Sequence, residues 1–210
     1  MTFQVKICGI TNTGDALTAV EAGANFIGLI FVETSPRCVS PETAAAIAAH
    51  LKGSDCRLVG VFQNADAAHI DAVRNSVPLN YVQLHGQETQ ATCAALAPAI
   101  KAVTSVEDAL AFKGHVDLIL VDRPKSSADS QFIESIAAHP SLPVIPQFLL
   151  AGGLNPDNLA ATIELFRDCQ ALLGFDVASG VEQAPGRKDA AKVKRFCEIA
   201  RVGGRHASTR

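Results

Sequence analysis

The stretch NFIGLIFVETSPRCVSPETAAAIAAHLKGSDCRLVGVF, residues 25–62, reads as one strand–helix–strand unit. Its two ends, 25–31 and 57–62, are near-continuous apolar runs, which are typical of strands covered on both sides. Between them, Ser40, Pro41 and Glu42 are the residue types of a helix start: an N-cap, a proline at the first helical position and an acid in the first turn. The stretch therefore predicts two buried strands joined by a helix that begins at Pro41.

The same alternation runs through the whole chain. Helix-period segments separate the apolar runs, and one of them is expected to begin at Asn155-Pro156-Asp157 in the same way as the helix at Pro41. The six further runs that predict strands are residues 3–8, 81–85, 100–103, 116–122, 147–152 and 172–177. Strand then helix, repeated eight times without a linker, is the signature of a (β/α)8 barrel.

We therefore predict a compact α/β fold, a single (β/α)8 TIM barrel, over residues 1–202, followed by a flexible C-terminal tail at 203–210. A doubly wound open sheet is the alternative. It often carries a glycine-rich fingerprint after its first strand. Here the first strand is followed by Cys8-Gly9-Ile10-Thr11, without a G-x-G-x-x-G motif, and the barrel is favoured.

Composition limits the compartment and the partners. The 210 residues are 48% hydrophobic and 19% charged, with a net charge of -3, so neither nucleic acid nor an anionic membrane is expected as a partner. No apolar run approaches the roughly 20 residues of a membrane helix, and the N-terminus lacks a signal-peptide pattern. The six cysteines are scattered, without metal-like spacing,. These features predict a cytoplasmic protein with reduced thiols and no metal site.

Polar and reactive residues gather where a barrel would carry its chemistry. The active site of this fold lies on the loops at the carboxyl ends of the strands, and the candidates at these ends are Cys8, Arg37, His85, Asp122 and Asp176. Each has a plainer interpretation: a buried cysteine is commonly a small core residue, and an aspartate commonly caps a helix or loop. His85 is expected to be structural or a hydrogen-bonding residue at the barrel mouth.

Two glycine-containing loops predict a phosphate site. Gly152 and Gly153 follow the seventh strand, and Ser179 and Gly180 follow the eighth. Paired glycines let backbone N–H groups approach an anion without obstruction, and residues 179–181 can start a short extra helix beside them. Barrels that handle sugar phosphates bind the phosphate between these two loops. The alternative is that the paired glycines only form a tight turn.

Six blocks of the sequence, taken together, resemble one family. They are KICGIT (6–11), SPR (35–37), VGVF (59–62), VQLHG (82–86), AGGLNPDN (151–158) and DVASGVEQAPGRKD (176–189). In this order they resemble the phosphoribosylanthranilate isomerase family of tryptophan biosynthesis, over roughly residues 5–196. The first and last blocks together are the most specific.

The resemblance implies an Amadori rearrangement of an aminoaldose to an aminoketose. It implies that Cys8 is the general base and Asp122 the general acid. By the same resemblance Arg37 would meet the anthranilate carboxylate. From the sequence itself, Arg37 is the candidate for a positive charge that lowers the pKa of Cys8. Asp176 would orient a sugar hydroxyl, and His85 would lie in the substrate site. No cofactor is implied, because the substrate's own nitrogen acts as the electron sink.

One loop departs from the family pattern. After its catalytic aspartate the family usually has a Gly-Gly-(Thr or Ser)-Gly run and then Phe-Asp-Trp, whereas this chain has a shorter loop, 123–131, without those glycines. Arg123 and Lys125 could supply anion contacts there instead. Three possibilities stay open: an active isomerase with a divergent loop, an isomerase acting on a related phosphorylated N-glycosylamine, or a non-catalytic paralogue that binds a phosphorylated metabolite. The expected partner is a small phosphorylated substrate, bound by a monomer or a homodimer.

Overall fold

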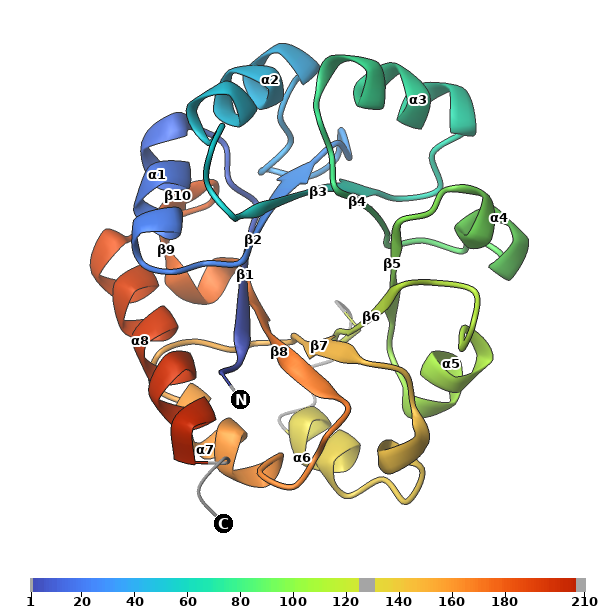
Figure 1. Ribbon diagram of the computed structural model, residues 1–210, viewed down its shortest axis with the longest axis vertical. Helices are drawn as coiled ribbons and strands as arrows, with labels where there is room; N and C mark the ends of the chain where they lie inside the picture. The colour runs from blue at the N-terminus through green and yellow to red at the C-terminus, as the bar shows by residue number, and fades with distance from the viewer. Residues whose placement is uncertain (1, 125–130, 207–210) are drawn as a thin grey trace.

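The chain forms a closed barrel of eight parallel strands. The computed structural model describes residues 2–124 and 131–206, and its strands follow one another around the barrel in chain order (Figure 1). The strands are β1 (Gln4–Cys8), β2 (Phe26–Ile30), β3 (Arg57–Phe62), β4 (Tyr81–Leu84), β5 (Ala99–Val103), β6 (Leu118–Val121), β7 (Phe148–Leu150) and β8 (Leu172–Val177). Strand β8 pairs with β1 and closes the ring. The (β/α)8 barrel predicted from the sequence is confirmed.

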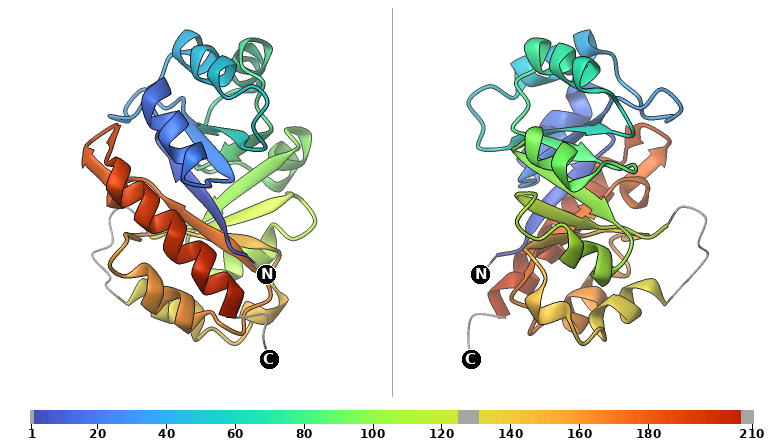
Figure 2. Two further views of the ribbon diagram at one scale, coloured as in Figure 1. Left: turned by 60° about the vertical axis from the view of Figure 1, so that its left-hand side comes forward. Right: turned by 90° about the vertical axis from the view of Figure 1, so that its right-hand side faces the viewer.

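Helices surround the barrel, one after each strand. They are α1 (Thr13–Glu21), α2 (Pro41–His50), α3 (Ala67–Ser76), α4 (Gln90–Ala95), α5 (Val106–Ala111), α6 (Phe132–Ala137), α7 (Leu159–Leu165) and α8 (Ala190–His206). Helix α2 begins at Pro41, as predicted, with the Ser40 side chain accepting a hydrogen bond from the backbone N–H of Thr43. A short hairpin, β9 (Glu182–Ala184) and β10 (Arg187–Lys188), lies beside α1 before the chain enters α8 (Figure 2).

The apolar core has two parts. The larger cluster contains residues of both the strands and the helices, so it lies between the barrel and its outer ring. The smaller cluster contains only residues at or directly after strands, and it fills the barrel interior: Phe26, Val59, Ile100, Leu118, Leu120, Leu149 and Ala151. Beside this cluster, Cys8, His85, Asp122 and Asp176 lie at or near the carboxyl ends of β1, β4, β6 and β8.

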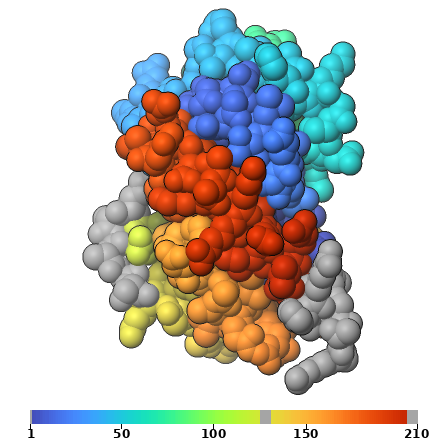
Figure 3. Space-filling model, turned by 90° about the vertical axis from the view of Figure 1, so that its left-hand side faces the viewer, coloured from blue at the N-terminus to red at the C-terminus, as the bar shows by residue number. Residues whose placement is uncertain are grey.

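Two boundaries differ from the prediction. Helix α7 begins at Leu159 rather than at Pro156, because the Asn155 side chain accepts hydrogen bonds from the backbone N–H groups of Asp157 and Asn158 and forms a turn first. Helix α8 continues through residues 203–206, where a flexible tail was predicted. There Gly203 lies close to Ile163 of α7, and α8 covers the surface between α1 and α7 (Figure 3). Residues 207–210 of the predicted tail lie outside the described part of the chain.

The shortened loop after β6 is only partly described. Asp122, Arg123 and Pro124 belong to the structure, whereas Lys125 and the rest of 125–130 lie outside the described residues. Within residues 2–124 and 131–206, no helix is long and apolar enough to cross a membrane.

Candidate active site

Cys8 is the last residue of β1, at the mouth of the barrel. It pairs in register with Gly28 of β2 and is 6% exposed. A methyl group at Gly28 would lie 2.8 Å from Sγ of Cys8 and 3.1 Å from Nζ of Lys6. The missing side chain at Gly28 therefore leaves the space in which a thiol and an ammonium group come close together.

Lys6 and Asp176 form an ion pair inside the barrel, below Cys8. Lys6 lies two residues before Cys8 on β1 and therefore on the same face of the strand. Its Nζ is 2.8 Å from Oδ1 of Asp176 on β8, and its side chain is fully buried. Burial lowers the pKa of Lys6, but Asp176 and Cys8 more than offset this, and the pKa lies above its ordinary value. Lys6 is therefore a fixed positive charge beside the thiol.

Burial raises the pKa of the Cys8 thiol. Lys6 and, more weakly, Lys188 favour the thiolate, whereas Asp176 opposes it, and the pKa stays above its ordinary value. Arg37 is the cation that the sequence predicted to lower this pKa. The structure differs, because desolvation outweighs the nearby cations and the cation with the largest effect is Lys6,.

Arg37, Glu182 and Lys188 form a second charged group at the mouth. Nε and Nη2 of Arg37 donate to the two carboxylate oxygens of Glu182 at 2.8 and 2.7 Å. Nζ of Lys188 donates to Oε1 of Glu182 at 2.9 Å and to the backbone carbonyls of Cys8 and Ala178 at 2.6 and 3.0 Å. Lys188 thus ties the end of β1 to the loop after β8. Two of the five N–H groups of Arg37 are used on Glu182, and the guanidinium fork keeps others for a second carboxylate.

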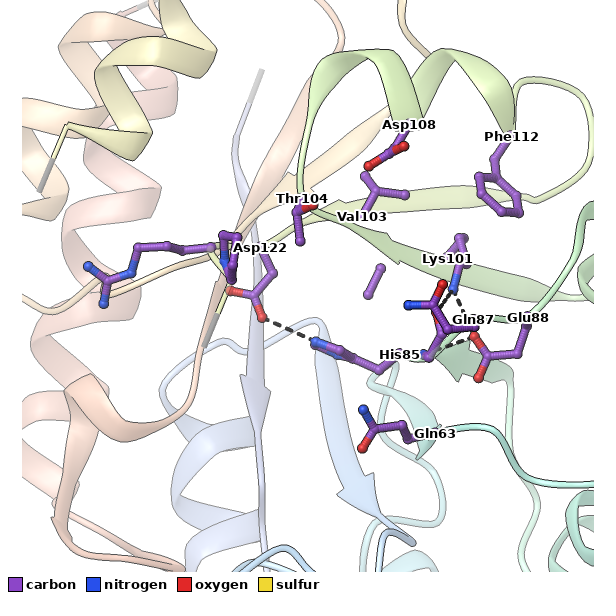
Figure 4. Close-up of a pocket in the computed structure, with 14 residues that line it drawn as sticks. Gln63, His85, Gln87, Glu88, Lys101, Val103, Thr104, Asp108, Phe112 and Asp122 are labelled. Atoms are coloured by element: carbon purple, nitrogen blue, oxygen red, sulfur yellow. Dashed lines mark hydrogen bonds and ion pairs between the residues drawn. The ribbon is translucent and has the colours of Figure 1, made fainter. Parts of the chain in front are cut away.

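Asp122 directly follows β6 and faces His85, which directly follows β4 (Figure 4). Oδ2 of Asp122 is 3.6 Å from Nε2 of His85, and the two side chains are 25% and 29% exposed. Both line a cavity of about 380 Å³ that runs over the ends of β4, β5 and β6. With β7 and β8 between β6 and β1 around the ring, Asp122 and Cys8 stand on different sides of the mouth.

A buried ion pair supports the loop that carries His85. Nζ of Lys101 lies 2.7 Å from Oε2 of Glu88 and donates to the carbonyl of Gly86 at 2.6 Å. The same carboxylate accepts from the backbone N–H groups of Asn64 and Gly86. Burial alone would raise the pKa of Glu88, but the hydrogen bonds from Lys101 and the backbone hold it below its ordinary value. The loops after β3 and β4 are therefore fastened together.

The two predicted glycine loops meet. Gly152 and Gly153 both adopt positive φ, 98° and 85°, a conformation that side chains disfavour. Residues 179–181 form the short helix η2 (Ser179–Val181), as the sequence predicted. A methyl group at Gly180 would overlap the carbonyl oxygen of Leu154, so the loop after β8 touches the loop after β7. Among the described residues, no group of three or more His, Cys, Asp or Glu side chains is placed to hold a metal ion.

The structure brings the sequence candidates to one end of the barrel in three groups: Cys8 with Asp176, His85 with Asp122, and the glycine loops, with Arg37 at the rim of the first. Sequence reasoning missed Lys6, Glu182 and Lys188. The signal for Lys6 was a lysine between the apolar residues Val5 and Ile7 of a predicted buried strand, and Lys188 and Glu182 lie in the block DVASGVEQAPGRKD.

Comparison with known proteins gives a consistent result. The family model described as N-(5'-phosphoribosyl)anthranilate (PRA) isomerase matches residues 5–199. The N-(5'-phosphoribosyl)anthranilate isomerase of Pelobacter propionicus is 40% identical over 95% of this chain and 96% of its own. That of Paracoccus denitrificans is also 40% identical, over 96% of this chain and 98% of its own.

Solved structures agree with the sequences. The phosphoribosyl anthranilate isomerase of Thermotoga maritima superposes with a TM-score of 0.83 at 37% identity, covering 94% of this chain and 98% of that one. A phosphoribosyl anthranilate isomerase in complex with reduced 1-(o-carboxyphenylamino)-1-deoxyribulose 5-phosphate gives a TM-score of 0.78 at 37% identity, with the same coverage.

Proposed function

The chain belongs to the N-(5'-phosphoribosyl)anthranilate isomerase family and catalyses that isomerisation in tryptophan biosynthesis, and we propose that Cys8 is its general base and Asp122 its general acid. The observation that carries the function is the family match over residues 5–199. Of the possibilities that the shortened loop left open, the comparisons support the isomerase. The roles of the individual residues are our proposal, and they rest on the geometry at the barrel mouth.

The reaction begins with opening of the ribose ring. Asp122 donates a proton to the ring oxygen as the bond between that oxygen and the anomeric carbon breaks, and the lone pair of the anthranilate nitrogen forms the C=N bond of a Schiff base. His85, with Nε2 at 3.6 Å from Oδ2, keeps the carboxyl group turned into the mouth. A proton donor placed in this way contributes typically about 10²- to 10⁴-fold to a rate.

Cys8 then acts on the neighbouring carbon. Its thiolate removes the proton from C2 of the opened sugar, and the electron pair of that C–H bond moves to form an enolamine as the C=N bond accepts electrons onto nitrogen. Tautomerisation of the enolamine gives the ketone. The thiolate is the reactive form of the side chain, and burial holds the thiol pKa above its ordinary value. We therefore expect kcat/KM to rise with pH as Cys8 ionises.

The remaining residues hold the substrate. Arg37 binds the anthranilate carboxylate with the N–H groups that Glu182 leaves available,. Asp176, held by Lys6 through Oδ1, accepts a hydrogen bond from a sugar hydroxyl. The phosphate group lies at Gly152, Gly153, Ser179 and Gly180, where two loops meet with bare backbone,. We propose a cytoplasmic enzyme with one barrel domain, as a monomer or a homodimer.

The test is turnover of freshly prepared phosphoribosylanthranilate by the purified protein, followed as loss of anthranilate fluorescence. Cys8→Ser and Asp122→Asn should each lower kcat by about 10²- to 10⁴-fold. Cys56→Ser and Asp168→Asn, which change the same residue types away from the barrel mouth, are the matched controls and should retain activity. A wild-type protein without turnover would contradict the function. Active Cys8→Ser or Asp122→Asn proteins would contradict the assigned roles.

A further inference from the structure

Arg123 crosses the glycine turn after β7. It directly follows Asp122, whose carboxyl group faces His85 (Figure 4). A methyl group at Gly152 would lie 2.7 Å from Cβ of Arg123 and 2.9 Å from its backbone nitrogen. A methyl group at Gly153 would lie 3.3 Å from Nη2 and 3.6 Å from Cζ of Arg123. The arginine therefore packs its backbone against Gly152 and its guanidinium group against Gly153.

The turn beneath that guanidinium group offers hydrogen-bond donors. Neither the backbone N–H of Gly152 nor that of Gly153 donates a hydrogen bond to another described residue. Gly153 is exposed and Gly152 half-buried, so both are accessible to a ligand. Gly180 of the next loop lies against the carbonyl of Leu154 and brings its own backbone to the same place. The backbone groups of Gly152, Gly153 and Gly180 are neutral, and the guanidinium group of Arg123 adds a positive charge beside Gly153.

We propose that the guanidinium group of Arg123 binds the phosphate group of the substrate, together with the backbone of Gly152, Gly153 and Gly180. The inference rests on the proposed function and adds to it a residue that none of the family blocks contains. A phosphomonoester carries close to two negative charges, and the planar guanidinium fork binds such oxygens with two parallel hydrogen bonds. In the chain, Arg123 stands at the start of the loop that lacks the family's glycine run, so it supplies donors where that run is missing.

The experiment compares Arg123→Gln and Arg123→Lys with the wild-type enzyme, using KM, kcat and competitive inhibition by inorganic phosphate. Arg201→Gln removes the same charge from an exposed position on α8 and is the matched control. For Arg123→Gln, we expect KM and the phosphate inhibition constant to rise together by about 10- to 100-fold, the loss typical of a hydrogen bond to a charged group. The value of kcat should change far less, because a contact made equally in ground and transition states affects KM. Arg123→Lys keeps the charge without the fork and should fall between the two.

Three results would overturn the proposal. An Arg123→Gln enzyme with unchanged KM and unchanged phosphate inhibition would show that Arg123 does not bind the phosphate. A fall in kcat without a rise in KM would place Arg123 with the acid instead. Equal effects of Arg123→Gln and Arg201→Gln would show that Arg123 acts only through the net charge of the protein and not through a contact with the phosphate.

A direct binding measurement separates this proposal from the function itself. Titration of inorganic phosphate into wild-type and Arg123→Gln protein by calorimetry requires no turnover, so a protein without isomerase activity still reports on the phosphate site. Weaker phosphate binding by Arg123→Gln supports the proposal, and unchanged binding contradicts it. If Arg123→Gln fails to fold, as judged by circular dichroism, the same titration with Arg123→Lys decides.

Discussion

Nζ of Lys6 lies 2.8 Å from Oδ1 of Asp176 in the barrel interior, two residues along β1 from the thiol that we propose as the base. The pair places opposite charges next to Cys8. Lys6 favours the thiolate and Asp176 disfavours it. Burial also disfavours the thiolate, and its effect on the pKa is larger than that of either charge. The proton affinity of Cys8 is therefore set by burial and by the charges of Lys6 and Asp176, rather than by Arg37 at the rim.

Lys6→Met and Asp176→Asn should shift the Cys8 pKa in opposite directions. Removing the ammonium group removes a stabiliser of the thiolate and raises the pKa, whereas removing the carboxylate lowers it,. The measurement is the pH dependence of Cys8 alkylation by iodoacetamide, with the Cys8 peptide quantified by mass spectrometry. Cys56, whose pKa burial raises to about 12, is the reference in the same protein and should not move.

Shifts of the Cys8 pKa in the same direction for both substitutions would contradict this account. Such a result would mean that altered packing, and not charge, controls the thiol. The double substitution Lys6→Met with Asp176→Asn distinguishes the two cases, because it removes both charges and should leave a pKa between those of the single variants.

Lys188→Met should destabilise the protein and slow the reaction. The side chain of Lys188 is 1% exposed, and its Nζ contacts Glu182 and the carbonyls of Cys8 and Ala178. Removing one partner of a buried ion pair typically costs about 3–5 kcal/mol, and here it also releases the end of β1. Urea denaturation measures the stability and the fluorescence assay measures kcat. Lys194→Met, on the exposed side of α8, should leave both unchanged, and equal effects of the two variants would refute the role of Lys188.

The fold was predictable because its determinants are local. Ser40 caps α2, and the buried run 57–62 forms β3. The eightfold repetition of such units, together with the absence of a G-x-G-x-x-G motif after the first strand, favoured a barrel over an open sheet. Cys8 and Asp122 could be named as candidates because parallel strands place their carboxyl ends at one edge, which makes a reactive residue at a strand end a candidate.

The charged partners were not predictable in the same way. Lys6 meets Asp176 across 170 residues, and Arg37 meets Glu182 across 145. No local pattern fixes which buried charge neutralises which, because the pairing depends on how the ring closes. The predicted start of α7 was wrong for a related reason. Asn155 has the side chain of an N-cap, but this side chain accepts hydrogen bonds within a turn that precedes the helix.

Acid should unfold the protein as two buried glutamates gain protons. The folded-state pKa values of Glu88 and Glu182 both lie below the ordinary value of 4.5. Burial raises each pKa, but hydrogen bonds from Lys101 to Glu88, and from Arg37 and Lys188 to Glu182, lower it by more than burial raises it. A carboxylate with a depressed pKa contributes stability above the unfolded value, and this stability is lost as the pH falls from there through the folded pKa. The free energy of unfolding should therefore fall as the pH drops below about 4.5.

Glu88→Gln tests the contribution of one of these groups. The variant should be less stable at pH 7, because Lys101 loses its buried partner,, and its stability should depend less on pH below 4.5. Urea titrations at several pH values measure both effects. Glu198→Gln on the exposed face of α8 should keep the wild-type pH dependence. A Glu88→Gln protein with the full wild-type slope would exclude Glu88 as a source of the acid sensitivity.

Gly180→Ala should weaken phosphate binding by steric means. The added methyl group would overlap the carbonyl oxygen of Leu154, so the loops after β7 and β8 must move apart and the proposed phosphate site between them is disturbed. We expect a higher KM and a lower melting temperature, since overpacking typically costs about 1–3 kcal/mol.

Gly14→Ala is the control for that substitution. Its methyl group would lie in ordinary contact, 3.4 Å from Oδ1 of Asn12, and alanine favours a helix over glycine by roughly 1 kcal/mol, so neither KM nor stability should suffer. A Gly180→Ala enzyme with unchanged KM and unchanged inhibition by inorganic phosphate would show that the phosphate lies away from the junction of these loops. That result would also remove the basis for assigning Arg123 to it, because Arg123 reaches the phosphate only if the glycine turn does.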